Sequence, residues 1–95
     1  MTNNELNSCV ESWQAFATLH NITLPNGKKL PKKFWGYFLG YSNSAFKKMV
    51  GNEKDIRRVK AYTAKHVKLI CNLEHDAFIR EIQSNIPGYM LDSYA

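Results

Sequence analysis

Hydrogen-bonding side chains gather in the stretch SNSAFKK, residues 42–48. An asparagine such as Asn43 can pair bidentately with adenine, and a lysine such as Lys47 can donate to O6 and N7 of guanine. Ser44 adds a hydroxyl group that both donates and accepts. Asn43, Ser44 and Lys47 are therefore candidates for contacts to base edges.

The positive charge of the chain is concentrated around this stretch. Residues 28–68 contain twelve basic and two acidic side chains, a net charge of +10, whereas the rest of the chain carries −5. This distribution indicates a polyanionic partner. Nucleic acid is favoured over a membrane, because no amphipathic stretch combines these lysines with a lipid-facing apolar stripe. A solvated basic surface without a partner is the alternative. The candidate phosphate contacts are Lys32, Lys33, Ser42, Lys48, Lys54, Arg57, Arg58 and Lys60.

The sequence shows no pattern typical of an enzyme. Its three histidines and two cysteines lack the spacing of a zinc site, and the pair Cys71 and His75 stands alone. No carboxylate pair, nucleophile motif or phosphate-binding glycine loop is visible. We therefore expect a protein without catalytic activity, metal, cofactor or small-molecule substrate.

Length and composition indicate one small domain over residues 1–95. With 44% hydrophobic and 13% aromatic residues, the chain can build a single modest core. The first residues do not resemble a signal peptide, and the longest apolar run, residues 34–41, is far shorter than the roughly 20 residues that span a bilayer. We expect a soluble, cytoplasmic protein in which Cys9 and Cys71 are buried, reduced thiols.

Helices are the elements that would position residues 42–48. Apolar residues at three- and four-residue spacing predict a first helix over residues 3–20, and Pro25-Asn26-Gly27 predicts a turn after it. Pro31 suits the first position of a second helix, over residues 31–39, with Gly40 just beyond its end. Ser42 is a strong N-cap for a third helix over residues 43–50.

The second half of the chain is also predicted to be helical. A short turn or helix is expected near residues 56–59, and Thr63 is expected to cap a helix that places Val67 and Ile70 on one face. A last helical segment should reach about residue 84, because Pro87-Gly88 would break it. No strand is predicted beyond a small hairpin near residues 26–27. The fold class is therefore an all-α bundle of four to six helices.

Residues 32–51, KKFWGYFLGYSNSAFKKMVG, resemble the helix-turn-helix of the Cro and phage-repressor family of DNA-binding proteins. In that family a small residue, here Gly36, lets the two helices cross closely, and a glycine, here Gly40, opens the turn. Trp35, Leu39, Tyr41, Phe46 and Met49 stand where the family places the side chains that lock the helices together. The resemblance covers residues 31–73, with KAYTAKHVKLICNL similar to the helix that follows the motif.

This resemblance implies a sequence-specific transcriptional regulator, in the first instance a repressor. The helix over residues 31–39 would then lie across the DNA backbone, and the helix over residues 43–50 would enter the major groove. The aromatic residues of the first of these helices are expected to belong to the core and not to stack on bases.

Pairing of two copies is a further expectation. One recognition helix offers few base contacts, so a homodimer on a palindromic operator is favoured. The apolar segment 86–95, with Ile86, Tyr89, Met90, Leu91 and Tyr94, is a candidate dimer contact, or else it folds over its own core. The alternative function is a helical protein-protein adaptor, such as a phage-encoded inhibitor that binds an acidic host protein.

Overall fold

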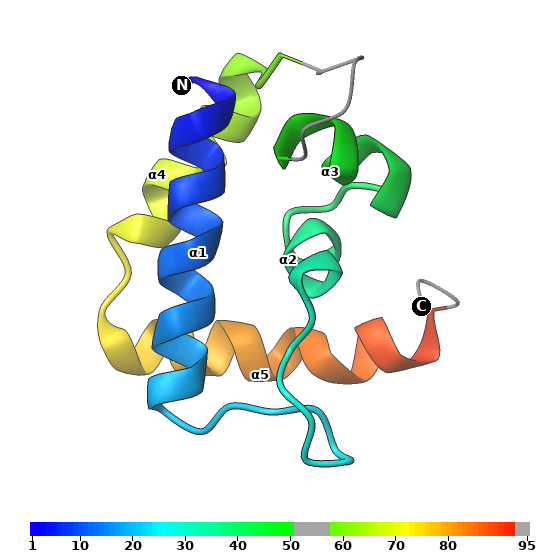
Figure 1. Cartoon of the computed structure of the whole chain (residues 1–95). Helices are drawn as coiled ribbons and strands as arrows, with labels where there is room; N and C mark the ends of the chain where they lie inside the picture. The colour runs from blue at the N-terminus through cyan, green and yellow to red at the C-terminus, as the bar shows by residue number, and fades with distance from the viewer. Residues whose placement is uncertain (51–57, 93–95) are drawn as a thin grey trace.

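Five helices make up the computed structural model, which describes residues 1–50 and 58–92 (Figure 1). They are α1 (Asn3–Leu19), α2 (Lys32–Phe38), α3 (Asn43–Val50), α4 (Ala61–Cys71) and α5 (His75–Leu91). Within the described ranges, the extended structure is limited to an antiparallel bridge between Thr23 and Lys29, around a turn at Gly27. The predicted all-α bundle is therefore confirmed.

The first helix begins and packs as its sequence predicts. The hydroxyl of Thr2 accepts a hydrogen bond from the Glu5 amide, and the Glu5 carboxylate accepts one from the Thr2 amide, which makes a capping box. Hydrogen bonds from the Thr2 amide and the Thr2 hydroxyl to the Glu5 carboxylate lower the pKa of Glu5. The buried face of α1 carries Leu6, Val10, Trp13 and Ala17.

An aromatic cluster joins α1, α2 and α5. The ring of Trp13 lies 5.8 Å from that of Trp35, 6.0 Å from that of Phe38 and 6.1 Å from that of Phe78, measured between centroids. Tilted and edge-on contacts of this kind stabilise a core beyond the area that they bury. Trp35 and Phe38 are buried as predicted, so the aromatic face of α2 belongs to the core.

The prediction that Pro87-Gly88 breaks the last helix is wrong, because α5 continues through both residues to Leu91. A proline inside a helix costs about 3 kcal/mol. Packing on both sides of it offsets that cost: Ile86 and Tyr89 are buried, and the Tyr89 ring lies 5.4 Å from that of Phe34 in α2. Tertiary contacts here override a local signal.

This geometry also bears on the segment expected to make a dimer. Ile86 and Tyr89 belong to the core of their own chain, whereas Met90 and Leu91 are exposed. Burial raises the pKa of Tyr89. Tyr94 lies outside the described residues.

The start of α4 and the environment of one cysteine also differ from the predictions. The helix begins at Ala61, after Lys60 as N-cap, so Thr63 is not its cap but a buried residue of its first turn. Cys71 is exposed rather than buried, because it ends α4 on the solvent side, and Cys9 is half-buried on α1. Among the described residues, no helix has the length and apolar character needed to cross a membrane.

Candidate nucleic-acid interface

A tight turn joins α2 to α3. Gly40 has a φ of +85°, a conformation that residues with a Cβ rarely adopt. Its amide donates to the Tyr37 carbonyl (2.9 Å), and the Tyr41 amide donates to the Gly36 carbonyl (2.9 Å). These two bonds form a Schellman motif, which ends α2 and redirects the chain into α3.

Ser42 starts α3 as predicted. Its hydroxyl accepts a hydrogen bond from the Ala45 amide (3.2 Å), and its carbonyl accepts one from the Phe46 amide (2.9 Å). The other end of α3 is fixed from α1, where the Asn3 side-chain amide donates to the Met49 carbonyl (2.9 Å). Both ends of the helix are therefore held.

The residues assigned to locking α2 on α3 lie inside the molecule. Trp35, Leu39, Phe46 and Met49 are all buried, and Gly36 is buried in the middle of α2. This burial leaves the opposite side of α3 to face outward. Ser44 and Lys47 are exposed there, and Lys48 is half-buried.

The turn is also fastened to α4. The hydroxyl of the half-buried Tyr41 hydrogen-bonds with that of Thr63. Burial and a hydrogen bond with Tyr62 raise the pKa of Tyr41. Thr63 therefore connects α4 to the turn, whereas its residue type had suggested an N-cap.

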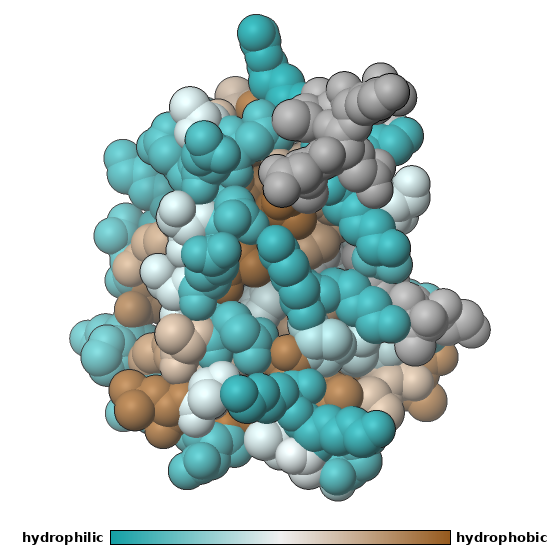
Figure 2. All heavy atoms as spheres, in the orientation of Figure 1, coloured by the Kyte–Doolittle hydropathy of each residue, from teal (hydrophilic) through white to brown (hydrophobic). Residues whose placement is uncertain are grey.

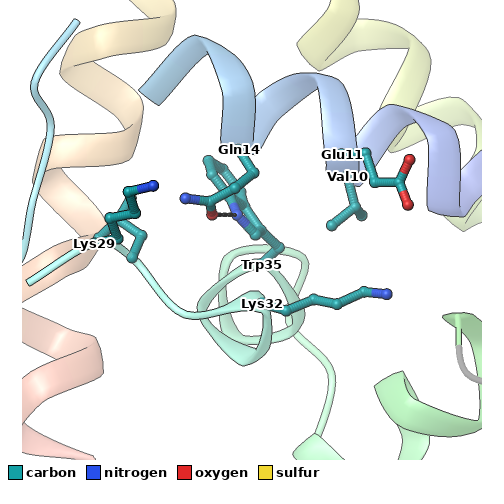
Figure 3. A pocket seen from close by; sticks show the side chains of 7 residues that line it. Val10, Glu11, Gln14, Lys29, Lys32 and Trp35 are labelled. Carbon is teal, nitrogen blue, oxygen red and sulfur yellow. Dashed lines mark hydrogen bonds between the residues drawn. The ribbon is translucent and has the colours of Figure 1, made fainter. Parts of the chain in front are cut away.

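Polar side chains of α1 position α2. The indole N–H of Trp35 donates to Oε1 of Gln14 (2.8 Å), as Figure 3 shows. The Nζ of Lys32 donates to Oδ1 of Asn7 (2.9 Å). Beside these bonds lies a hollow of about 350 Å³, lined by Val10, Glu11, Gln14, Lys29, Leu30, Lys32 and Trp35. The apolar residues that line it are almost completely buried: Val10, Leu30 and Trp35 are each at most 2% exposed.

Sequence reasoning missed this contribution of α1. Asn3, Asn7 and Gln14 are spaced four and seven residues apart, so they follow one face of the helix. This polar stripe lies next to the apolar stripe of α1. It was the signal in the sequence that α1 forms hydrogen bonds with α2 and α3.

Candidate base and phosphate contacts converge where α2 meets α3. A hollow of about 170 Å³ is lined by Lys32, Lys33, Asn43, Phe46, Lys47 and Val50. Three of these six side chains are ammonium groups from two helices, over an apolar base of Phe46 and Val50. On the face shown in Figure 2, hydrophilic side chains dominate the surface over α2, with apolar atoms in the gaps between them. An anion in this hollow would lie near lysines of both helices, of which Lys32 also donates its Nζ to Asn7.

Asn43 also lines this hollow, but its side-chain oxygen is not accessible. Its side-chain oxygen is buried and has no hydrogen-bond partner in the described part of the chain. A buried acceptor left unpaired costs about 1–3 kcal/mol. In this conformation the oxygen cannot reach a base, so bidentate pairing with adenine requires the side chain to rotate. Ser44 and Lys47 need no such rearrangement, because both are exposed.

The remaining candidate phosphate contacts lie at the start of α3, before α4, or outside the described residues. Ser42 is exposed at the start of α3, and Arg58 and Lys60 are exposed on the segment that enters α4. The Nζ of Lys60 lies 5.8 Å from the centroid of the Tyr62 ring, a cation-π contact. Among the described residues, no hydrogen bond or ion pair connects Arg58 or Lys60 to the hollow between α2 and α3. Lys54 and Arg57 lie outside the described residues.

Comparisons of the chain with protein-family models, with curated proteins and with solved structures find no match. Within the described ranges, no group of three or more histidine, cysteine, aspartate and glutamate side chains could hold a metal ion.

Proposed function

We propose that this protein is a sequence-specific DNA-binding regulator, in the first instance a repressor, that binds a palindromic operator as a homodimer. One observation carries the proposal: Lys32 and Lys33 from α2 and Asn43 and Lys47 from α3 line a single hollow. Residues selected from the sequence for two different kinds of contact thus lie beside each other.

The lysines of α2 and the exposed residues of α3 suit two different kinds of contact to DNA. Phosphates would be bound by Lys32 and Lys33 at the start of α2, since lysines neutralise the backbone without reading its sequence. Ser44 and Lys47, on the outward side of α3, would face base edges in the major groove. The buried face of α3 and its two fixed ends would hold these side chains in register.

The alternative function, a helical adaptor, would use the same lysines. A helical adaptor that binds an acidic protein would also place carboxylates near Lys32, Lys33 and Lys47. It would not need Ser44, and it would not distinguish one DNA sequence from another.

The test begins by selecting bound sequences from a random duplex library, followed by anisotropy titrations over a range of salt concentrations. K47A should lower the affinity for the selected site about tenfold or more and relax the preference at particular base pairs. K28A is the matched control, because it removes the same charge from an exposed position at the Gly27 turn, outside the hollow. Equal losses from K47A and K28A on every sequence would contradict the proposal.

A second arm addresses the adaptor. If no duplex is selected, and nuclease-treated lysate yields a stable complex with an acidic protein that K47A weakens, the adaptor replaces the regulator. S44A should impair selected-site binding only in the DNA-binding case.

A further inference from the structure

The two cysteines of the chain lie in contact, although they are 62 positions apart in the sequence. Cys9 is half-buried in α1, and Cys71 is the exposed last residue of α4. Their thiols hydrogen-bond with each other. Because the sequence holds no third cysteine, each thiol has the other as its only possible disulfide partner within the chain.

Buried neighbours hold this contact on both helices. Val10, next to Cys9, and Ile70, next to Cys71, are buried in the same hydrophobic cluster, against which Cys9 itself packs. Figure 1 shows α4 crossing behind α1, and the contact between the thiols places Cys71 at this crossing. The folded chain therefore keeps two sulfur atoms from different helices together, whereas an unfolded chain would bring them together only by closing a long loop.

The two thiols differ in how readily they react. Burial, the charge of a Cys71 thiolate and hydrogen bonding between the thiols raise the pKa of Cys9. Because the thiolate and not the thiol attacks an oxidant, the exposed Cys71 should react first. Conversion of the Cys71 thiolate to a protonated sulfenic acid removes the negative charge that opposes ionisation of Cys9. Cys9 can then act as the resolving nucleophile.

We infer that Cys9 and Cys71 form a site of reversible oxidation, at which a hydroperoxide converts the two thiols into a disulfide between α1 and α4. With hydrogen peroxide, the Cys71 thiolate attacks one oxygen, the O–O bond breaks, and a sulfenic acid and a hydroxide ion result. The Cys9 thiolate then attacks the sulfur of Cys71, the S–O bond breaks, and a second hydroxide ion leaves. The two hydroxide ions take up the two thiol protons, so the thiols are oxidised by two electrons and the peroxide is reduced to two molecules of water.

The disulfide would join the two helices that hold α3 and the turn before it. Asn3 of α1 donates to the Met49 carbonyl in the last turn of α3, and Thr63 of α4 hydrogen-bonds with Tyr41 in the turn. The cross-link also closes a loop of roughly 60 residues, which removes conformations from the unfolded chain. Oxidation should therefore raise the Tm, by about 10–20 °C for a domain of this size.

Oxidation of the full chain with a small excess of hydrogen peroxide tests the site without DNA. The wild type should become a monomer lighter by two hydrogen atoms, and proteolysis should yield one pair of peptides joined through Cys9 and Cys71. Dithiothreitol should restore both thiols and the original Tm. C71S/L69C is the matched control, because it keeps one thiol on each helix but moves the second to an exposed position on another side of α4. It should form the intramolecular disulfide at least about tenfold more slowly, since its sulfur atoms do not meet.

Four outcomes would overturn the inference. One is a product heavier by two or three oxygen atoms, because Cys71 would then reach sulfinic or sulfonic acid without meeting Cys9. The second is a covalent dimer through Cys71 in place of the intramolecular product. The third is a disulfide that lowers the Tm, since the folded chain would have to distort to form it. The fourth is an equal rate of disulfide formation in the wild type and in C71S/L69C. All are read from mass and thermal unfolding, so a failure of the DNA-binding proposal leaves this test unaffected.

Discussion

The close approach of α2 to α5 at Gly88 supports a prediction about stability. A Cβ placed on Gly88 would overlap the hydroxyl oxygen of Tyr37, while the next nearest atom, Cζ of the same ring, would be in ordinary contact at 3.4 Å. The hydroxyl group alone causes the conflict. The Tyr37 ring cannot move away freely, because its centroid lies 5.8 Å from that of Tyr89.

Two opposing terms determine the effect of G88A. Overpacking of this kind costs about 1–3 kcal/mol, and replacing glycine by alanine inside a helix returns about 1 kcal/mol. We expect G88A to lower the free energy of unfolding by about 1 kcal/mol, which corresponds to a decrease in Tm of roughly 4–8 °C for a domain of this size. In a Y37F background the overlap is absent, so the same substitution should raise Tm.

Thermal and urea unfolding of the wild type, G88A, Y37F and the double variant form a double-mutant cycle. The cycle isolates the contact, because any cost of removing the hydroxyl is present in both Y37F and the double variant and cancels when these two are compared. A change in Tm of the same sign and size in both backgrounds would refute the packing of α5 on α2 through Gly88, and with it the continuous helix through Pro87.

Four further outcomes are expected. G40V should destabilise the protein by about 1–2 kcal/mol in urea unfolding, because a β-branched residue is strained at φ +85° although nothing lies within 4 Å of an added Cβ. R58A should weaken binding to all duplexes alike and reduce the salt slope by about one, and a change in base preference would exclude a phosphate contact. Iodoacetamide should modify Cys71 before Cys9 near pH 8, as followed by mass spectrometry, since burial and the neighbouring Cys71 raise the pKa of the Cys9 thiol and reduce its thiolate fraction. Truncation after Asn85 should abolish cooperative unfolding, because it removes two buried core residues of α5, and a folded monomer would disprove this role.

The sequence predicted α2, the turn and α3 closely because their signals are local. Gly40 and Ser42 act through hydrogen bonds to residues within five positions along the chain, so their types alone indicate where one helix ends and the next begins. The α3 range of residues 43–50 was accordingly correct, and α2 differed by one residue at each end.

The errors occurred where distant contacts decide the structure. Pro87 signals a helix end, but Tyr89 packs on Phe34 of α2, which lies about fifty residues earlier in the chain. Thr63 has the chemistry of a cap, but the Tyr41 hydroxyl engages it from the turn. The gathering of Lys32, Lys33 and Lys47 around one hollow could not be derived from the sequence either, since it depends on how α2 crosses α3.

The hydrogen bond from Asn3 to the Met49 carbonyl has a consequence for the order of folding. It joins residues 46 positions apart, whereas α2 and α3 are separated by a turn of four residues. Closing a short loop costs less chain entropy than closing a long one, so the α2–α3 pair can form as a local unit before α1 docks. Met49 therefore gains its partner only at the long-range step, and the last turn of α3 should be the slowest part of that helix to acquire protection from hydrogen exchange during refolding.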